Sequence, residues 1–506
     1  MTTDLLPSIS VTLNQVKATS ASARVPINAT VILTARSGPI SELVKVSSYT
    51  EAVKIFGPGN LRDDSGQLIT PLTPALYGIE QYLKTYNYVN IIRVAGDSAA
   101  KATINMTASA GSEVTGSIIT GESVYKTDLY NGDEINLVYN SARTRLSISG
   151  ELAGTTYTTP LEVIDLSSAK ADELVPVLNK LVTNWNAMNT GIVLENKFKN
   201  KTAADATLGP TDVVKGTIGG GAAGNTGIAD SAIIEAFKII EDPSVQVQDV
   251  VMAPEFRSQA VVNAGTALKN AYFYIVAATG DTLAAKQASV ENYVPSDKGA
   301  LYIPSGCKMG EPDITVPFEI AALYAWATTY NINRYYAPAG VKRGTMDIVT
   351  DIVDNLSELD SQAMYNKTIT NPVPANPVRY LTNYGYTIFG QKTMDADQVF
   401  TNRINVSNLV NYIYIEGNNL LLPYLFEYTP ISTFQKVYLD LDKMLSNLAV
   451  QEILYDDYQI VCDTSNNTPE TLAKHELHAT LAIRPINVTE YIFLDLTVTD
   501  ELGGEA

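Results

Sequence analysis

The sequence is poor in the side chains that most often carry out chemistry in enzymes. Its 506 residues include two histidines, His475 and His478, and two cysteines, Cys307 and Cys462. Two cysteines cannot form the disulfide framework of a small secreted domain, so we expect buried thiols in a protein made in a reducing compartment. Two neighbouring histidines leave little imidazole for acid–base catalysis elsewhere in the chain.

Long apolar runs and a surplus of positive charge are also missing. The longest apolar run, residues 271–278, is far shorter than the roughly 20 residues of a membrane-spanning helix. The first residues lack the basic segment and apolar core of a signal peptide. Because 54 Asp and Glu outnumber 35 Lys and Arg, the formal net charge is −19. Nucleic acids and anionic membranes bind basic surfaces, so we expect neither as a partner.

The chain does contain enough apolar material for several folded cores. Hydrophobic residues make up 45% and charged residues 18% of the sequence, which is typical of globular rather than disordered proteins. At roughly 150 residues per domain, the length predicts about three domains.

Two regions of different composition predict the architecture. Helices and apolar strands alternate over residues 228–293, which indicates a parallel or mixed sheet with helical crossovers. Residues 101–165 are rich in Thr, Ser, Gly and Tyr, and their short alternating runs indicate a small β-rich insertion. We therefore expect a mixed α/β (α+β) multidomain fold. The expected parts are an extended N-terminal arm at 1–30, an α/β domain at 31–98 plus 200–330, an inserted β-rich surface domain at 99–199, a C-terminal core domain at 331–489 and a C-terminal strand at 490–506.

Local signals predict individual helices. Ser48 and Glu51 have the spacing of a capping box, and Thr73-Pro74 is typical of a helix start. Apolar residues at helical spacing predict a helix at about 432–449 and another whose stripe is formed by Ile348, Ile352, Leu356 and Leu359.

Both ends of the chain show the alternation of a β-strand. Near the N-terminus, one face of the expected strand carries Ile9, Val11 and Leu13, and no obvious hairpin partner follows. Near the C-terminus, the corresponding face carries Ile492, Leu494, Leu496 and Val498. An unpaired strand in a tail must pair with something else, so we expect terminal β arms that bind a partner.

The pattern Gly219-x-Gly221-x-x-Gly224 before a helix is the strongest candidate for a nucleotide site. The preceding strand is weak, however, and no separate strand supplies a ribose-binding acid, because Glu241 and Asp242 end the same helix. The pattern therefore favours a flexible connection between domains.

The remaining candidates for chemistry are weaker. The surroundings of His475 and His478 alternate like a strand, which would point the two rings to opposite faces, and no further histidine completes a zinc site. Acidic clusters, such as the one at Asp347, Asp351 and Asp354, are more typical of solvated faces. Since a nucleophile elbow and a Walker lysine are also absent, we expect no catalytic, cofactor or metal site and no enzyme.

The run from Tyr458 to Glu470 (YQIVCDTSNNTPE) combines a strand, a polar turn over 463–467 and a helix start at Thr468-Pro469. It closely resembles the C-terminal signature of the contractile tail sheath proteins of myophages. Three further matches follow the family's order: Gly38-Pro39 with residues 56–57 and 91–94, residues 336–340 with Arg343-Gly344, and Phe389-Gly390 with residues 403–406. The resemblance covers about 30–95 and 210–500, and the sequence departs from the family pattern at Ser407-Asn408 and at residues 316–319.

The resemblance implies a structural protein without a cofactor. Sheath subunits of this family form hexameric rings that stack as a helix around a tail tube, and terminal arms add strands to the sheets of neighbouring subunits. The implied partners are further copies of the chain, the tail tube protein, and the baseplate and tail terminator proteins. The implied location is the tail of a virion, assembled in the cytoplasm of a host bacterium, where contraction drives the tube through the envelope.

Two alternatives stay open at the level of sequence. The chain could form the sheath of a non-viral contractile device, such as a tailocin, an extracellular injection system or a secretion apparatus. A more distant alternative is a carbohydrate- or nucleotide-acting α/β enzyme, which would rest on the glycine loop and on the alternation of helices and strands.

Overall fold

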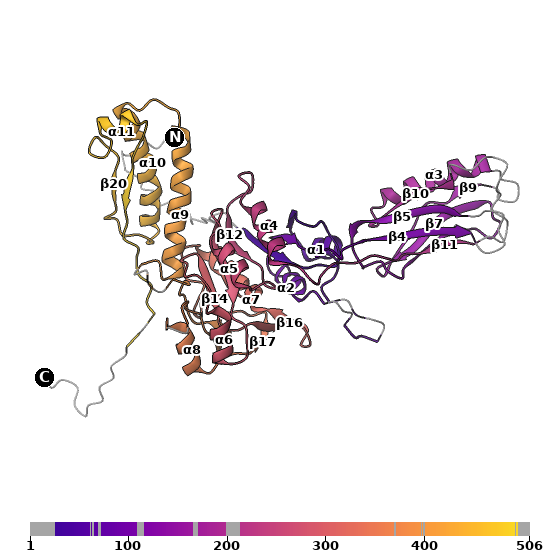
Figure 1. Cartoon of the computed structure of the whole chain (residues 1–506), viewed down its shortest axis with the longest axis horizontal. Coiled ribbons are helices and arrows are strands. Elements are labelled where there is room, and N and C mark those ends of the chain that lie inside the picture. The colour runs from indigo at the N-terminus through magenta and orange to yellow at the C-terminus, as the bar shows by residue number, and fades with distance from the viewer. Residues whose placement is uncertain are drawn as a thin grey trace, which may run out of the picture. The chain divides into compact units, whose positions relative to one another are not determined.

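The computed structural model describes residues 26–60, 62, 65–68, 72–108, 116–164, 171–198, 213–368, 371–395, 397, 400–490 and 492–493. The described chain forms two compact units (Figure 1). The first comprises the residues up to Arg334 together with Pro338–Asn402, and the second comprises Tyr335–Ala337 and the residues from Arg403 onward.

A six-stranded mixed sheet forms the centre of the first unit. Its order is β14-β13-β12-β1-β3-β2, with every neighbouring pair parallel except β2 and β3. The strands are β1 (Ala29–Leu33), β2 (Leu43–Val46), β3 (Val89–Arg93), β12 (Gln248–Met252), β13 (Ala271–Ala277) and β14 (Gly299–Tyr302). All seven residues of β13 are buried, as expected for a parallel strand covered on both faces. The mixed α/β fold expected from the sequence is confirmed.

Helices flank this sheet, and the first two begin at the start signals that the sequence shows. They are α1 (Tyr49–Phe56), α2 (Pro74–Tyr82), α4 (Asp230–Ile240), α5 (Gln259–Thr266), α6 (Leu283–Val290) and α7 (Phe318–Ile332). At the start of α1, the Glu51 amide donates to Ser48 Oγ and the Glu51 carboxylate accepts from the Ser47 amide. Pro74 occupies the first turn of α2, but the Thr73 hydroxyl makes no capping bond.

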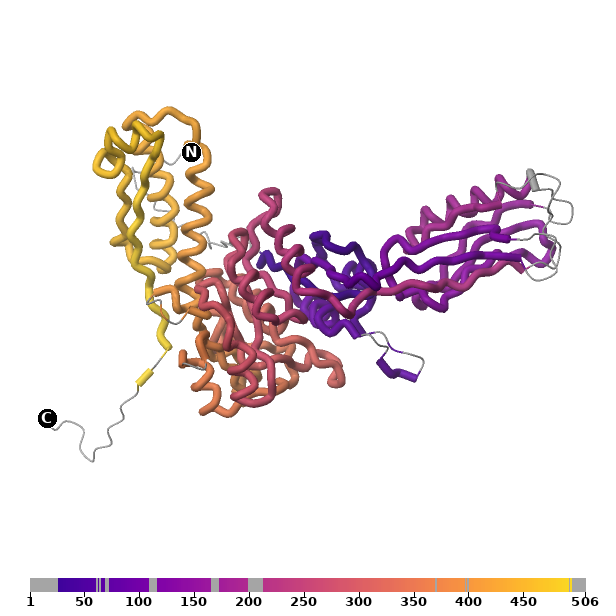
Figure 2. The backbone as a smooth tube through the Cα atoms, viewed as in Figure 1, coloured from indigo at the N-terminus to yellow at the C-terminus, as the bar shows by residue number. Residues whose placement is uncertain are grey.

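The polar stretch after β3 forms an eight-stranded antiparallel sheet (Figure 2). Its strands are β4 (Lys101–Ala108), β5 (Ser117–Lys126), β6 (Glu134–Tyr139), β7 (Arg145–Leu152), β8 (Thr155–Thr158), β9 (Glu162–Val163), β10 (Ile192–Asn196) and β11 (Val214–Thr217). One sheet face packs on α3 (Ala171–Ala187) around the buried Trp185, whose indole N–H donates to the Ile192 carbonyl. Strand β11 pairs with β4 and β6, so this sheet extends beyond the limit of residue 199 expected from composition.

The glycine-rich segment after β11 is ordered rather than a loose connection. The Gly219 amide donates to the Thr103 carbonyl, and the Ala222 amide donates to the Ala100 carbonyl. A Cβ atom at Gly221 would lie 2.0 Å from the Thr127 carbonyl oxygen, which only glycine avoids. The glycines of this segment therefore allow it to pack against the stem of the insertion.

Two buried arginines join the insertion to the central sheet. Arg93, at the end of β3, donates to the carbonyls of Gly38, Lys126 and Ala223. Arg36 forms a two-bond ion pair with Asp128. The end of β5 and the turn after it, together with the returning segment at Ala223, are thereby tied to the ends of β1 and β3.

One helix expected from the sequence is wrong. Ile352 lies inside strand β17 (Val349–Val353), and Ile348 immediately precedes it. Strand β17 pairs with β15 (Gly306–Met309), which also pairs with β16 (Thr315–Pro317). The helix starts later, as α8 (Glu358–Tyr365), where Ser357 Oγ accepts from the Asp360 amide. Asp354, with φ of +52°, breaks the run between them, so one stripe of apolar residues serves two elements. A hairpin of β18 (Val378–Leu381) and β19 (Gly385–Ile388) completes the unit.

The second unit is an antiparallel helix pair with a small sheet. Helix α9 (Ile404–Leu421) continues into the 3-10 turn η2 (Leu422–Tyr424), and α10 (Ile431–Val450) runs back beside it. Leu409 and Ile413 of α9 pack on Leu445 and Leu448 of α10, while the opposite ends of the helices meet around Phe434 and Val437. Against α10 lie β20 (Gln459–Val461), β21 (Thr480–Ala482) and the short α11 (Pro469–Ala473).

Candidate strand-docking site

The small sheet of the second unit is incomplete as a sheet. Strands β20 and β21 pair antiparallel over three residues each, and within the described part of the chain no third strand joins either of them. A two-stranded sheet of this length is marginal in water, and its outer edges present unpaired amides and carbonyls. Both edges are therefore available for an added strand.

A groove runs along the β20 side of this sheet. It has a volume of about 390 Å³ and is lined by Gln435, Tyr438, Leu439, Ile460, Cys462 and Asp463. Leu439 is 61% exposed although it lies on α10 directly beside the sheet. An apolar wall next to an open strand edge gives both main-chain hydrogen bonds and a place for every second side chain of an added strand.

The environment of the thiol in this groove slows its reactions without enclosing it completely. Cys462 is 5% exposed, and burial first and the nearby Asp463 second raise the pKa of its thiol. Cys307 in β15 is fully buried, and burial first and the nearby Glu319 second raise the pKa of its thiol. Both cysteines are free, as the sequence predicts.

The polar residues of the signature run brace the hairpin that carries the groove. The Asn466 and Asn467 side-chain amides donate to the Val461 and His478 carbonyls, and the His478 amide donates back to Asn467. The Thr468 hydroxyl caps α11 by accepting from the Thr471 amide, and Pro469 fills the first turn. The predicted turn and helix start are confirmed, and their function in the fold is to hold β20 beside β21.

The chain leaves the hairpin along the segment before β20. The Ile486 amide donates to the Ile453 carbonyl, and the Tyr455 amide donates to the Arg484 carbonyl. Glu490 then forms a two-bond ion pair with Arg403, at 2.5 Å to Nε and 3.0 Å to the terminal nitrogen. Beyond this pair, Ile492 and Phe493 are 87% and 89% exposed and lie in no strand.

Most of the arm residues expected from the sequence lie outside the described residues. These are Ile9, Val11 and Leu13 of the N-terminal arm and Leu494, Leu496 and Val498 of the C-terminal arm. Ile492 is described, and its exposed side chain has no place in the core of its own unit. The pairing of these residues with a partner stays a prediction.

The histidines do not lie on a strand. His475 lies in a turn after α11, with φ of +62°, and His478 precedes β21, because the side-chain bonds from Asn466 and Asn467 hold this segment out of the sheet. His478 Nε2 lies 3.0 Å from Glu476. Across the described ranges, no group of three or more His, Cys, Asp or Glu side chains has the arrangement of a metal site. In the same ranges, no helix combines the length and apolar content needed to cross a membrane.

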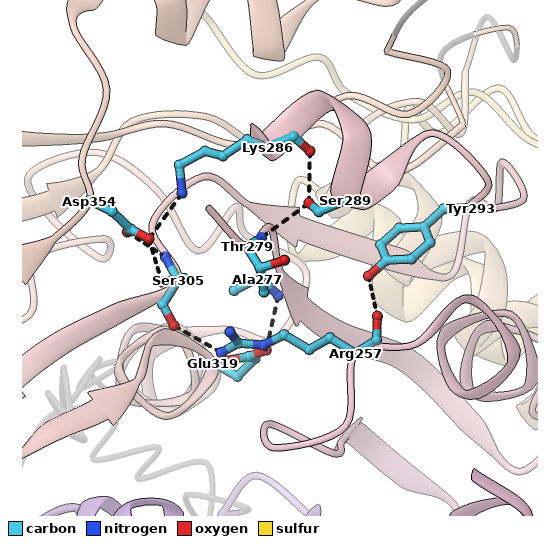
Figure 3. Close-up of polar contacts among 9 residues, drawn as sticks. All are labelled: Arg257, Ala277, Thr279, Lys286, Ser289, Tyr293, Ser305, Glu319 and Asp354. Atoms are coloured by element: carbon cyan, nitrogen blue, oxygen red, sulfur yellow. Dashed lines mark hydrogen bonds and ion pairs between the residues drawn. The ribbon is translucent and has the colours of Figure 1, made fainter. Parts of the chain in front are cut away.

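A second polar cluster lies at the carboxyl ends of β12, β13 and β14 (Figure 3). Arg257 forms a two-bond ion pair with the buried Glu319 of α7 and donates to the Ser305 carbonyl. Asp354 accepts from Ser305 and lies 3.4 Å from Lys286 Nζ, whose pKa is lowered mainly by burial. Open parallel sheets often bind ligands at this edge, but here the charges pair with one another and brace α6, α7 and β17. Sequence reasoning missed this cluster, because its members are up to 97 positions apart and no local spacing connects them.

Comparisons with known proteins assign the fold. No family model matches the sequence. The sheath tail protein of Desulfitobacterium hafniense superposes with a TM-score of 0.55 at 10% identity, over 92% of this chain and 97% of that one. The sheath of an extracellular contractile injection system, PVC, in its contracted state gives 0.54 at 11% identity, over 93% and 91% of the two chains. The chain therefore has the fold of contractile sheath proteins.

Sequence comparison finds similarity to the tail sheath proteins of two phages. The tail sheath protein of Enterobacteria phage T4 is 29% identical over 195 residues, which cover 37% of this chain and 28% of the relative. The tail sheath protein of Vibrio phage KVP40 is 26% identical over 181 residues, which cover 36% and 26%. The matched part spans about a quarter of the length of these relatives. The predicted resemblance to contractile tail sheath proteins is confirmed.

Proposed function

We propose that this protein is the structural subunit of a contractile tail sheath, which polymerises around a tail tube and shortens to drive the tube through a host envelope. The observation that carries the proposal is the combination of a sheath fold with an open-edged hairpin and exposed apolar residues at the described C-terminal end. Within the described residues, a hairpin with open edges and exposed apolar side chains at Ile492 and Phe493 are the features expected of the two halves of a strand-donation contact.

The geometry of the second unit supports donation to another copy rather than to its own hairpin. The C-terminal tail, which is the chain after Glu490, starts beside Arg403 at the N-terminal end of α9. The groove lies beside Tyr438 and Leu439, in the first half of the antiparallel α10. With a rise of 1.5 Å per residue, these points are roughly 20 Å apart along the helices. An extended strand of 3.3 Å per residue would use about six of the residues after 490 to cover that distance.

The residues that would cover this distance are the apolar residues of the tail. The alternating residues end at Val498, so a return to the tail's own groove would use most of the apolar segment before it reached an edge. Donation to a neighbour keeps the whole segment free to pair. A contact in which one surface binds a different surface of the next copy grows without closing, which is what a helical sheath requires.

The proposal includes the partners and location that the sheath role implies. The partners are further copies in stacked hexameric rings, the tail tube, and the baseplate and tail terminator proteins, and the location is a virion tail assembled in a bacterial cytoplasm. Support comes from the relatives, which are phage tail sheath proteins, and from neighbours whose structures are sheath and baseplate assemblies.

We also propose that the protein is not an enzyme and needs no cofactor. The support is the internal pairing of the charges at the carboxyl edge of the main sheet and the packing of the glycine segment against its own insertion. Protein-dependent, saturable turnover that disappears on replacing His475 or Asp463 would contradict this part of the proposal.

Negative-stain electron microscopy of the purified protein tests the main proposal. We expect long hollow cylinders at high protein concentration and single subunits at low concentration. A protein that stays monomeric under all conditions, also when mixed with its tail tube protein, would contradict a sheath role.

A second candidate is the sheath of a non-viral contractile device, because the structural neighbours include the anti-feeding prophage and the PVC system. The physical arguments are the same for both. Genes for a capsid and a terminase next to this gene would decide for a phage.

A further inference from the structure

The Arg403–Glu490 ion pair connects two places that are 87 positions apart in the sequence. Arg403 is the residue that precedes α9, and its side chain makes no capping bond to the helix. A positive side chain at a helix N-terminus is unfavourable, because the helix dipole is positive there. Glu490 neutralises this charge and brings a carboxylate to the end of the helix that favours it.

The pair is better shielded than an ordinary surface ion pair. The exposed fractions of the two side chains are 28% for Arg403 and 18% for Glu490, and both guanidinium bonds reach the carboxylate. Two parallel bonds fix the orientation of both side chains as well as their distance. The nearby Arg484–Asp457 pair also binds the departing segment, but its side chains are 61% and 54% exposed.

The way in which the C-terminal segment is held by its own unit changes at this pair. Before it, residues 484–486 are bonded to residues 453–455 by backbone hydrogen bonds. After it, the apolar side chains of Ile492 and Phe493 are almost fully exposed. Glu490 is thus the last point at which the described C-terminal segment is held by its own unit.

We propose that the Arg403–Glu490 pair is an anchor that fixes where the donated C-terminal arm begins. This inference rests on the proposed strand donation. With the anchor in place, the residues up to 490 stay on their own subunit, and the neighbour receives the arm on a short and defined tether. Without it, residues 487–490 join the tether, so more chain must be ordered each time a subunit is added.

Limited proteolysis of the free subunit tests the anchor without any assembly. A broad-specificity protease should trim the unaltered protein to an end just after residue 490, as read by intact mass. In Glu490→Ala, trimming should continue toward Pro485, and cleavage between 487 and 490 should be about tenfold faster. Asp457→Asn is the matched control, because it breaks the exposed pair on the same segment and should leave the end at 490.

The charge-swapped double variant, Arg403→Glu with Glu490→Arg, adds a rescue. It should restore the protected end, since the pair is re-formed and a carboxylate still lies at the start of α9. Arg403→Ala should have the same effect as Glu490→Ala. If it also perturbs folding of the helix pair, Glu490→Ala and the charge-swapped variant still test whether the ion pair is the anchor. Equal trimming of Glu490→Ala, Asp457→Asn and the unaltered protein would overturn the anchor.

Assembly then separates the anchor from the proposed function. The protein concentration at which half of the subunits enter cylinders should rise at least about fivefold in Glu490→Ala and return in the swapped variant. If removing residues 491–506 leaves cylinder formation unchanged, strand donation is wrong whatever the proteolysis shows. If that removal abolishes cylinders while Glu490→Ala assembles normally, donation stands and the anchor is wrong.

Discussion

Glu80 illustrates how a single residue can make the stability of this fold depend on pH. It lies on α2 with its side chain fully buried, and one carboxylate oxygen accepts from the Gly59 amide while the other has no partner in the described structure. Burial raises the pKa of this carboxyl to about 7, against the opposing effects of the Gly59 bond and of Lys84. Glu80 is therefore held in its neutral form in mildly acidic solution.

The sign of the effect follows from this raised pKa. Below about pH 4.5, the carboxyl is neutral in both the folded and the unfolded state and costs nothing. As the pH rises from about 4.5 to about 7, only the unfolded state ionises, so the free energy of unfolding falls by about 3 kcal/mol. Above pH 7 the loss is complete.

We expect Glu80→Gln to remove this dependence, because the amide keeps an acceptor for Gly59 and carries no charge. The variant should be more stable than the unaltered protein by about 1–3 kcal/mol at pH 8 and equally stable at pH 4. Urea unfolding at pH 4, 6 and 8 measures the difference. Glu235→Gln, at an exposed position on α4, is the control and should show no such trend. An equal effect of Glu80→Gln at pH 4 and pH 8 would contradict the assignment.

At the scale of elements, the insertion is fixed to its parent domain more firmly than its polar composition predicts. Arg93 is fully buried, and burial lowers the pKa of its guanidinium to about 10. Its bonds to the Lys126 and Ala223 carbonyls are made at the base of the insertion, one at the end of β5 and one on the segment that returns from it. Removing the insertion therefore leaves a buried cation with fewer acceptors.

We still expect the insertion to lie on the outer surface of the sheath and to be dispensable for assembly. The natural cut follows the sheet: residues 101–218 are replaced by a short Gly/Ser linker, because β11 belongs to the insertion and Ala100 pairs with Ala222 at its base. The shortened protein should fold with reduced stability and still form cylinders. Loss of soluble folding would show that the insertion is part of the core.

Arg93→Met tests the Arg93 joint, by which we mean the three bonds from Arg93 to the Gly38, Lys126 and Ala223 carbonyls. In the full-length protein it should cost about 2–4 kcal/mol, because three carbonyl acceptors lose their donor inside the protein. In the shortened protein it should cost less or be stabilising, since the cation it removes has lost part of its pairing. Urea unfolding of all four proteins gives the coupling energy. The same cost in both backgrounds would show that the joint is not coupled to the insertion.

Particular elements show which parts of the fold could be predicted from the sequence and which could not. The capping pairs at α1 and α11, the apolar strands β3 and β13, and the turn after β20 were predictable, because each depends on residues within a few positions. The stripe from Ile348 to Leu359 was wrong as one helix, because the pairing of β17 with β15 depends on residues about 45 positions away. The groove beside β20, the Arg93 joint and the Arg403–Glu490 pair also depend on distant partners. No local sequence pattern predicts these three features.

At the scale of the whole molecule, the arms should separate folding from assembly. Each short strand adds several main-chain hydrogen bonds at about 0.5–1.5 kcal/mol each, so one arm contributes only a few kcal/mol, while a lattice repeats the contact on every subunit. Leu494→Pro removes a backbone donor and prevents regular pairing at that position. We expect a folded subunit of near-normal thermal stability that builds no long cylinders.

Deleting residues 1–15 should have the same result for the N-terminal arm. Thermal unfolding and electron microscopy of both variants provide the two readouts. Cylinders of normal length from either variant would show that its terminus is not exchanged between subunits. An unfolded Leu494→Pro subunit would instead place the C-terminal strand in its own core.

The position of Cys462 gives this protein a chemical reporter of its own assembly. Cys307 is fully buried inside a sheet, so Cys462, on the wall of the groove, is the only cysteine that a strand added beside β20 would cover. The rate of modification by a small maleimide should therefore fall as subunits join, and it should fall little for Leu494→Pro if the C-terminal arm fills this groove. Unfolding in urea, which exposes both thiols, calibrates complete labelling. Growth of the polymer can thus be followed as a loss of thiol reactivity, without an engineered residue.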